Sequence, residues 1–345
     1  MSTHKDITIY DIAEALNLSP ATVSRGLKEH PSIRKDTRKK ILDKAKEMGY
    51  RQNFFASNLR RNRTNTIGVI VPRLNSYFMS TVLAGMEKIA NQAGYNLIIS
   101  QSMESLQKEV VNVKTLYNSR VDGLLVSLAY GTDDISHFED LLDKGVPLIF
   151  FDRVFEHPQC TSIVIDNYKA GYEVTDHLIG QGCTRIAHIT ASLKRNVYAD
   201  RLRGYKQALA DHNILYDEKL VFINNLSEQA GVDVCNSLLQ MEPKPDGIFA
   251  TNDACAVSII RELKLAGISI PKDIAVAGFN NDPLSKVIEP NLTTINYPGH
   301  EMGEIAASTL IRRLDLQHGA SLNSIVLRHE LIIRESSRKN GGTGL

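Results

Sequence analysis

The chain has 345 residues, of which 43% are hydrophobic and 23% charged, a composition that argues against a disordered or fibrous protein. No stretch approaches the roughly 20 apolar residues that cross a bilayer, and no secretory signal precedes the first predicted helix, so we expect two or three domains in the cytoplasm and no membrane contact. The net charge of +1 hides a split, because residues 1–63 have 14 Lys and Arg against 7 Asp and Glu, or +7, while the remainder has 26 against 32, or −6. This asymmetry points to a polyanionic partner for the first part of the chain alone, with a merely solvated basic face as the alternative.

Residues 7–27 predict two short helices joined by a tight turn. Thr8 can cap the first helix, with Asp11 as its capping partner three residues on, and this helix should end near Leu16. Apolar residues recur on one of its faces at Ile9, Ile12, Ala13 and Leu16. Ser19 can cap a second helix that Pro20 begins, because proline at the first helical position loses no hydrogen bond.

The second helix should present DNA-reading side chains. Val23 and Leu27 are four residues apart and should bury against the first helix. The outer side then holds Ala21, Thr22, Ser24 and Arg25. Small groups with one arginine near a helix start suit the major groove, where Arg25 would contact a guanine edge and the small side chains would meet thymine methyl groups. A helical hairpin with a solvated outer face is the alternative.

A third helix should complete a three-helix headpiece. Asp36 can cap it, and Gly49 should end it. Its apolar stripe would be Ile41, Leu42, Ala45 and Met48. The segment 53–59 is too short for a stable isolated helix. Leu59, which precedes two arginines, is well placed to enter a DNA base step, although packing on the core is the alternative.

From Thr66 onward, short β-branched runs alternate with longer amphipathic segments. We expect strands at residues 67–71, 97–100, 123–126, 148–151, 162–165, 186–190, 247–250 and 274–278. Helices between them should include residues 80–93, 174–181, 201–211 and 254–265, several of them closed by glycine at positions 94, 182 and 267. Such repeats give parallel, doubly wound sheets, in which ligands bind beyond the carboxyl ends of the strands.

Four segments are candidates to line a ligand cleft in this core. In the first, Tyr77 and Phe78 can stack on a sugar ring, with ordinary loop packing as the alternative. In the second, Arg201 can donate two parallel hydrogen bonds to vicinal hydroxyls or to an anion, with a salt bridge at a helix start as the alternative.

The other two candidate segments follow later strands. Asn252 is expected to make a polar contact, while Asp253 is expected to cap the next helix. Asn280 lies in the last segment, after the strand expected at 274–278. An amide at this corner offers a ligand one acceptor and one donor group.

These segments together resemble the lac repressor family of bacterial regulators. The resemblance rests on residues 9–27, 49–53 (GYRQN), 56–59 (ASNL) and 67–72 (IGVIVP), and it covers nearly the whole chain. It implies an α-helical headpiece at 1–52 and a hinge helix or linker at 53–63. It also implies an α/β core at 64–345, with two lobes like those of periplasmic sugar-binding proteins. Lobe 1 would comprise about 64–165 and 296–325, and lobe 2 about 166–293 and 326–345.

The resemblance also implies roles for individual residues. The hinge would fold where two subunits meet on a pseudo-palindromic operator, with Leu59 of each subunit in the minor groove. DNA contacts would come from Thr8, Tyr10, Ser19, Pro20, Ala21, Thr22, Ser24, Arg25, Asn53, Ala56 and Leu59. Effector contacts would come from Tyr77, Phe78, Arg201, Asn252 and Asn280. Mainly structural or hinge-lining roles would fall to Asp152, Arg153, Asp166 and Asn167.

One corner of the expected site departs from the family pattern. Many relatives have an aspartate where Asn280 stands. A carboxylate accepts two hydroxyl hydrogen bonds, whereas an amide accepts and donates, so the effector's polar pattern here can differ from that of a simple neutral sugar.

The sequence therefore predicts a nucleoid-associated transcription factor, most simply a homodimeric repressor of carbohydrate genes with a carbohydrate effector between its lobes. The tail at 335–345 has no leucine heptads that would build a tetramer, which favours a dimer. A regulator that answers to a phosphorylated carrier protein, as catabolite-control relatives do, is the alternative.

An enzyme is the third function class to weigh. We find no GxGxxG after a strand, no GxxxxGK[ST], no GxSxG and no HExxH, so no catalytic residue, cofactor or metal is expected. The four cysteines form no CxxC pair, which predicts buried thiols at Cys160, Cys183, Cys235 and Cys255.

Overall fold

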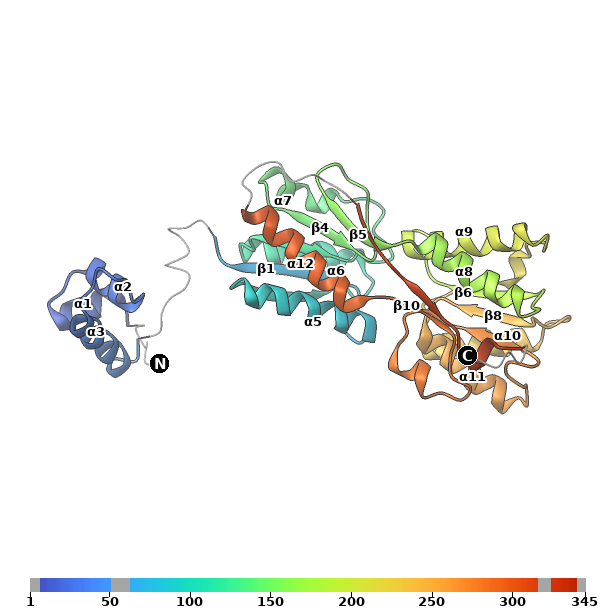
Figure 1. Ribbon diagram of the computed structural model, residues 1–345. Helices are drawn as coiled ribbons and strands as arrows, with labels where there is room; N and C mark the ends of the chain where they lie inside the picture. The colour runs from blue at the N-terminus through green and yellow to red at the C-terminus, as the bar shows by residue number, and fades with distance from the viewer. Residues whose placement is uncertain (1–6, 51–62, 316–323, 340–345) are drawn as a thin grey trace, which may run out of the picture. The chain divides into compact units, whose positions relative to one another are not determined.

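The computed structural model describes residues 7–50, 63–315 and 324–339. The chain divides into two compact units, Met1–Thr64 and Asn65–Leu345, which we treat separately as the headpiece and the core (Figure 1). In the described residues, no helix is both long and apolar enough to span a bilayer.

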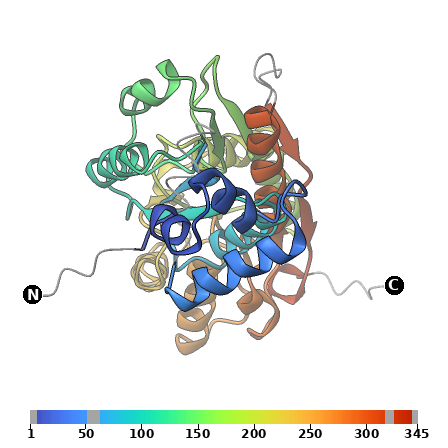
Figure 2. The same cartoon turned by 90° about the vertical axis from the view of Figure 1, so that its left-hand side faces the viewer.

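The headpiece contains three short helices around a small core (Figure 2). They are α1 (Ile9–Leu16), α2 (Pro20–Leu27) and α3 (Lys35–Glu47). The expected caps of the first two helices are confirmed, because the Thr8 amide donates to Asp11 Oδ2 at 2.7 Å and the Thr22 amide donates to Ser19 Oγ at 3.1 Å. The buried residues are Ile12, Ala13, Val23, Ile41 and Ala45.

Two expectations for α3 are wrong. Arg34 occupies the N-cap position without a side-chain cap hydrogen bond, and Asp36 lies inside the first turn, where a carboxylate still interacts favourably with the helix dipole. Leu42 is 39% exposed, because the buried stripe of this short helix narrows to Ile41 and Ala45. The helix does end before Gly49, whose φ of +69° suits glycine.

The first sheet of the core has six parallel strands in the order β11-β5-β4-β3-β1-β2. They are β1 (Thr66–Val71), β2 (Asn96–Gln101), β3 (Gly123–Val126), β4 (Leu148–Phe151), β5 (Thr161–Ile165) and β11 (Ser324–Leu327). On β1, alternate residues pack on opposite faces, with Val69 on one side and Ile70 on the other. Helices α5 (Tyr77–Gln92) and α12 (Gly299–Asp315) cover one face, and α6 (Leu106–Asn118) and α7 (Glu139–Asp143) the other.

The second sheet has four parallel strands in the order β7-β6-β8-β9. They are β6 (Ile186–Thr190), β7 (Val221–Ile223), β8 (Gly247–Ala250) and β9 (Ala275–Ala277). Helices α8 (Asn167–Gly180) and α9 (Asn196–Asp211) cover one face, and α10 (Glu228–Leu239) and α11 (Asp253–Leu265) the other. The expected parallel, doubly wound architecture is confirmed.

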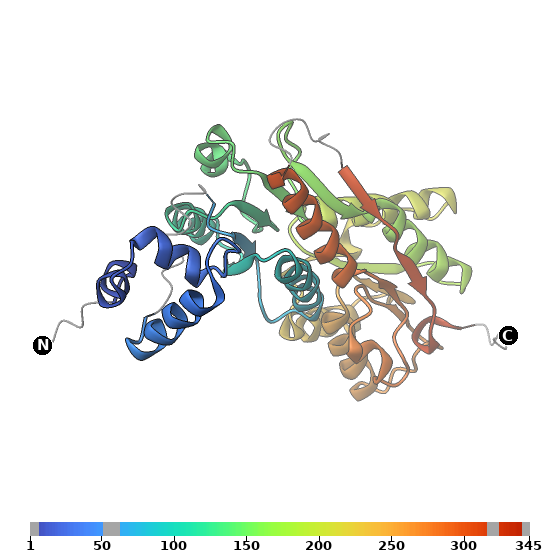
Figure 3. The ribbon, with the colours of Figure 1, turned by 60° about the vertical axis from the view of Figure 1, so that its left-hand side comes forward.

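Two long segments join the halves of the core. Strand β10 (Thr294–Asn296) pairs antiparallel with β12 (Glu330–Ile332), and Figure 3 shows these C-terminal strands running from one half of the core to the other. Four short 3-10 turns complete the described elements: η1 (Ser136–Phe138), η2 (Glu218–Leu220), η3 (Pro283–Lys286) and η4 (Glu335–Ser337).

Each half of the core contains one pair of helices in very close contact. A side-chain carbon on Gly303 of α12 would lie 1.9 Å from the carbonyl oxygen of Val82 on α5, and one on Gly204 of α9 would lie 2.1 Å from the carbonyl oxygen of Tyr168 on α8. Figure 3 shows α5 and α12 side by side. Only glycine allows this approach, which brings the first turns of α5 and α9 toward the centre of the core.

Several expected helices begin earlier than predicted. Helix α8 begins at Asn167 rather than 174, and α9 at Asn196 rather than 201. The first turns of both helices carry polar residues that face other parts of the core. Such turns show little amphipathic periodicity, so the sequence pattern did not reveal them. The four cysteines are buried free thiols, as expected, and burial raises the pKa of Cys160 to about 11.

Candidate functional site

The outer face of α2 carries the expected DNA-reading residues. Ala21 and Arg25 are exposed, whereas Thr22 and Ser24 are half-buried. In this structure the Arg25 Nε donates to the carbonyl oxygen of Ala21 at 3.3 Å, so its guanidinium lies along its own helix. The hydroxyl groups of Thr22 and Ser19 are 2.8 Å apart. The Thr22 hydroxyl is therefore part of the helix cap, and its methyl group remains as the group that can meet a base.

Tyr10 on α1 adds an aromatic side chain to the headpiece surface and is 68% exposed. Exposed basic residues on α3 include Lys35, Lys39, Lys40 and Lys46. The other expected DNA contacts, Asn53, Ala56 and Leu59, lie outside the described residues. The described headpiece therefore combines a small polar reading surface with basic groups that suit phosphates.

A cavity of about 700 Å³ lies in the core and collects the residues that follow several strands. Its walls include all five of the expected effector residues, Tyr77, Phe78, Arg201, Asn252 and Asn280. They come from α5, α9, the start of α11 and the loop after β9. Residues far apart in the sequence thus meet at one cavity, as the carboxyl ends of parallel strands lead us to expect.

Arg201 is the most deeply buried cation of this cavity, with only 3% of the residue exposed. Its Nε donates to Asn167 Oδ1 at 2.9 Å, and its Nη1 donates to the carbonyl oxygen of Thr251 at 3.2 Å. The guanidinium lies 3.5 Å from the centre of the Phe279 ring. Burial lowers the pKa of Arg201, and none of the ion pairs among the described residues includes it.

The alternative of a helix-start salt bridge at Arg201 is wrong. Arg201 lies in the second turn of α9, and Asp200 pairs instead with Arg203, at 2.9 Å. Arg201 is held by neutral oxygens and an aromatic ring, so its positive charge remains available to a ligand.

The aromatic wall is different from the expected pair. Phe78 is buried and stacks on Tyr297, with ring centres 4.1 Å apart, while Tyr77 is 50% exposed at the start of α5. The Tyr297 hydroxyl donates to Asp152 Oδ1 at 2.8 Å. Tyr297 comes from the segment after β10, so no local pattern around Phe78 identifies its partner.

The cap of α11 expected at Asp253 is wrong. Asn252 caps α11, because its Oδ1 accepts from the amides of Ala254 and Cys255 at 2.9 and 3.3 Å. Asp253 is fully buried and accepts from the Thr294 hydroxyl and the Asp282 amide, both at 2.7 Å. Burial raises the pKa of Asp253 to about 6. Asn252 still lines the cavity, but its side-chain Oδ1 already accepts the two hydrogen bonds of the helix cap.

The loop after β9 has an unusual backbone. Asn280 has a φ of +119° and Asn281 a φ of +58°, and the Asn280 amide donates to the carbonyl oxygen of Ile295. Such values are uncommon for residues with side chains and indicate a loop that the surrounding structure fixes. Asn280 and Asp282 both line the cavity as a result.

The sequence analysis missed a charged group on the wall from the first sheet. Arg153, which was expected to be structural, lines the cavity and donates to Glu104 Oε2 at 2.8 Å and to the Tyr198 hydroxyl at 2.9 Å. Arg73 lies 3.5 Å from Glu104 Oε1. In parallel sheets, ligands bind beside the residues that follow a strand. The position of Arg153 just after β4 is therefore the signal that could have identified it.

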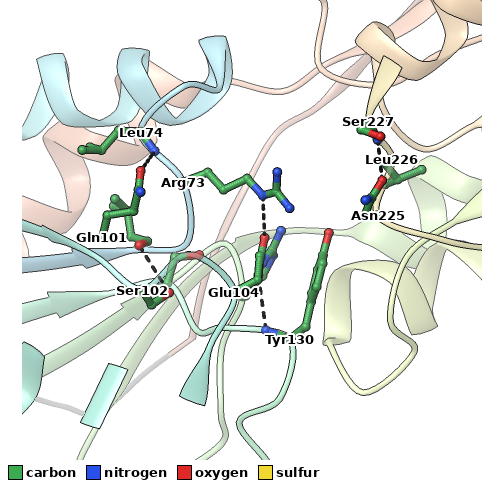
Figure 4. A network of polar contacts seen from close by, with 12 residues as sticks. Arg73, Leu74, Gln101, Ser102, Glu104, Tyr130, Asn225, Leu226 and Ser227 are labelled. Carbon is green, nitrogen blue, oxygen red and sulfur yellow. Dashed lines mark hydrogen bonds and ion pairs between the residues drawn. The ribbon is translucent and has the colours of Figure 1, made fainter. Parts of the chain in front are cut away.

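Figure 4 shows this wall from close by. Arg73 and Tyr130 converge on Glu104, whose Oε2 also accepts from the Tyr130 amide at 3.3 Å. Asn225, Leu226 and Ser227, which precede α10, face them from the other half of the core. The Glu104 carboxylate therefore pairs with both Arg73 and Arg153. Arg201 differs from these two arginines, because no ion pair in the described residues includes it.

Comparisons with known proteins agree with this geometry. Residues 8–53 match the family described as bacterial regulatory proteins, lacI family, and residues 175–337 match the periplasmic binding protein-like domain. The transcriptional regulator RegA of Clostridium saccharobutylicum is 32% identical over 331 residues, which cover 96% of this chain and 99% of that protein.

Two further similarities extend over the whole chain. Catabolite control protein A of Priestia megaterium is 29% identical over 334 residues, which cover 96% of this chain and all of that protein. A solved complex of the transcriptional regulator CelR with cellobiose is 27% identical with a TM-score of 0.73, and it covers 96% of this chain and 99% of that one. The similarities therefore span both compact units.

Proposed function

Because the chain belongs to the lacI family of bacterial regulatory proteins and is a DNA-binding transcriptional regulator, we propose that a small effector in the core cavity controls its operator affinity. The regulator acts as a dimeric repressor of carbohydrate-metabolism genes in the cytoplasm, associated with the nucleoid, and it has no catalytic activity. The CelR complex with cellobiose supports a carbohydrate as the effector class.

The observation that carries this proposal is Arg201. A buried guanidinium without a salt bridge, next to an aromatic ring and a cavity, costs stability unless a ligand uses it. It can donate parallel hydrogen bonds to vicinal hydroxyls, while Tyr77, Phe78 and Tyr297 offer ring faces. Asn252 and Asn280 supply further polar groups on the same walls.

The proposed domain division follows the expected boundaries, with a headpiece at 1–52, a hinge at 53–63 and a two-lobed core at 64–345. The headpiece reads DNA through α2, with support from Thr8 and Tyr10. The hinge residues Asn53, Ala56 and Leu59 approach the minor groove, and Leu59 acts as a wedge there. L59A should lower operator affinity and DNA bending together, and an unchanged bend would remove the wedge.

A second copy of the chain is the partner that suits the exposed edge of the first sheet. Strand β2 lies at that edge, and its Ile98 and Ile99 are 39% and 42% exposed. Val110 and Val111 on α6 are 40% and 62% exposed, and α6 contacts β2. An apolar edge of this kind invites pairing unless another chain covers it, so we assign it to the dimer. V111E should shift the chain toward monomer in sedimentation equilibrium.

Effector binding between the two sheets changes the angle between the two lobes. In a dimer, this change alters the distance between the two hinge segments. Effector and operator affinities are then linked, so the factor by which effector changes operator affinity equals the factor by which operator changes effector affinity.

The test is an operator titration with and without a core ligand. A thermal-shift screen of sugars, sugar phosphates and nucleosides, cellobiose included, identifies the ligand. R201A should abolish the response and keep basal operator binding. R203A is the matched control, because Arg203 is on the same helix but its side chain is 69% exposed.

Two results would contradict the proposal. An R201A variant that responds like the wild type would remove Arg201 from the site. A wild type whose operator affinity ignores every core ligand, but changes with a phosphorylated carrier protein, would favour the catabolite-control alternative.

A further inference from the structure

The carboxylate of Asp282 is an unsatisfied charge on the cavity wall. Asp282 is only 8% exposed, and its buried Oδ1 has no hydrogen-bond partner in residues 7–50, 63–315 and 324–339. None of the ion pairs among the described residues includes it. Its backbone amide is engaged, since it donates to Asp253 Oδ2 at 2.7 Å. Asp282 is therefore fixed in place through its backbone while part of its side chain has no partner.

The neighbouring residues in the loop have other tasks. The Asn281 side chain accepts at Oδ1 from Arg334 Nη2 at 2.7 Å, and its Nδ2 donates to Asn296 Oδ1 at 3.0 Å. Asn281 therefore holds the loop to the crossing segments and is not among the residues that line the cavity. Asn280 does line it, and its side chain hydrogen-bonds to the Asp282 carboxylate. Asn281 thus fixes the loop, and Asn280 orients the Asp282 side chain.

We propose that Asp282 is the effector-recognising carboxylate of this chain and that it accepts a hydrogen bond from a hydroxyl or ammonium group of the ligand. The inference rests on the proposed function, because it assumes that the cavity takes a small effector.

Asp282 and Arg201 then select a ligand with two kinds of polar group. Arg201 offers only donors and Asp282 offers mainly acceptors. Glu104 already pairs with Arg153 and Arg73, so these arginines do not compensate Asp282. A polyol or an amino sugar has hydroxyl oxygens for Arg201 and a hydroxyl or ammonium donor for Asp282. A purely anionic ligand has no donor for Asp282.

Burial and a neighbouring carboxylate make the ionisation of Asp282 unfavourable. Burial, followed by repulsion from Asp253 on α11, raises the pKa of Asp282 to about 7, although the hydrogen bond from Asn280 opposes this. The other charged residues on the same cavity are Arg73 after β1, Glu104 after β2, Asp152 and Arg153 after β4, Arg201 on α9 and Glu228 at the start of α10. Arg334 acts on Asp253 from the segment before η4. Because the folded-state pKa lies above the unfolded value, Asp282 lowers stability progressively as pH rises from about 4 to about 7, and above that range its cost is constant.

The first experiment needs no ligand and compares unfolding temperatures of the full chain at pH 8 and pH 5. D282N should unfold at a higher temperature than the wild type at pH 8, and the difference should shrink at pH 5, where the carboxyl is already protonated. D246N is the matched control, because the Asp246 carboxylate accepts from the backbone amides of Thr184 and Arg185, both at 2.8 Å, and its loss should lower the unfolding temperature. A D282N variant that is less stable than the wild type at pH 8 would make Asp282 a structural residue and overturn the proposal.

The second experiment measures binding of the ligand from the thermal-shift screen by calorimetry. D282N should bind it about tenfold more weakly or worse, and N280D/D282N, which returns the carboxylate to position 280, should recover part of the loss. D-glucose and D-glucosamine in the screen distinguish a hydroxyl from an ammonium donor, since the ammonium gains more affinity than a hydroxyl as Asp282 ionises.

The failures of the two proposals differ. If R201A loses the ligand and D282N keeps wild-type affinity, the proposed function stands and this inference is wrong. If both variants keep wild-type affinity, the ligand does not occupy this cavity, and both fail.

Discussion

The headpiece and the core cavity obtain their functional surfaces in different ways. The reading face of the headpiece comes from one helix of eight residues, α2, whose cap and buried residues lie within the same short stretch. The cavity takes its walls from α5, α9, α11 and several loops, and from residues as distant as Glu104 and Asp282. A surface built locally can tolerate changes elsewhere, whereas a surface built from many segments depends on the packing of the whole core.

The largest expected effect comes from breaking the close helix contact in the core. G303V should lower the free energy of unfolding by about 4 kcal/mol or more, because a side chain at this position would collide with the backbone of α5. Chemical denaturation should show loss of both core stability and effector binding. G180A is the control, since Gly180 has open space around it, and its stability should change little. A stable G303V core would mean that α5 and α12 can separate without loss of the fold.

The next effect separates the two units. I41A should destabilise the headpiece by about 3 kcal/mol, because Ile41 is fully buried in a core of five residues. Operator binding should be lost while the core transition in a thermal scan remains unchanged. L42A, at the exposed neighbouring position, should bind DNA almost normally. A shifted core transition in I41A would contradict the independence of the two units.

A smaller change tests base reading by α2. R25A should weaken operator binding by about 1–3 kcal/mol and spare binding to random DNA, because a guanine contact carries sequence information. Fluorescence anisotropy with both DNAs at the same salt concentration measures the difference. Equal losses on the two DNAs would assign Arg25 to phosphate contact.

The smallest expected effect concerns the cap of α2. S19A should cost the headpiece about 1 kcal/mol, because the Thr22 amide would lose its acceptor. Near-UV or fluorescence melting of the isolated headpiece transition measures it. No change in that transition would show that the Pro20 start alone maintains the helix.

Local signals predicted much of the structure correctly. The caps at Thr8 and Ser19 and the strands at residues 123–126, 148–151, 186–190 and 247–250 were all identified, since short-range chemistry and β-branched runs specify them. The cap expected at Asp36 was wrong, because several residues near a helix start can serve and the loop geometry selects one. For the same reason, Asn252 rather than the expected Asp253 caps α11.

The amino-acid sequence by itself determined the helix-turn-helix headpiece, the parallel α/β core and the candidate residues at the strand ends. Their determinants are periodicity, capping and turn chemistry, which act within a few residues. Only the tertiary structure decided that Phe78 stacks on Tyr297, that Glu104 satisfies Arg153, and that no ion pair within the described parts of the chain includes Arg201 or Asp282. Those facts depend on which distant groups meet in a desolvated site, where each charge is compensated or left unpaired by segments that no local pattern connects.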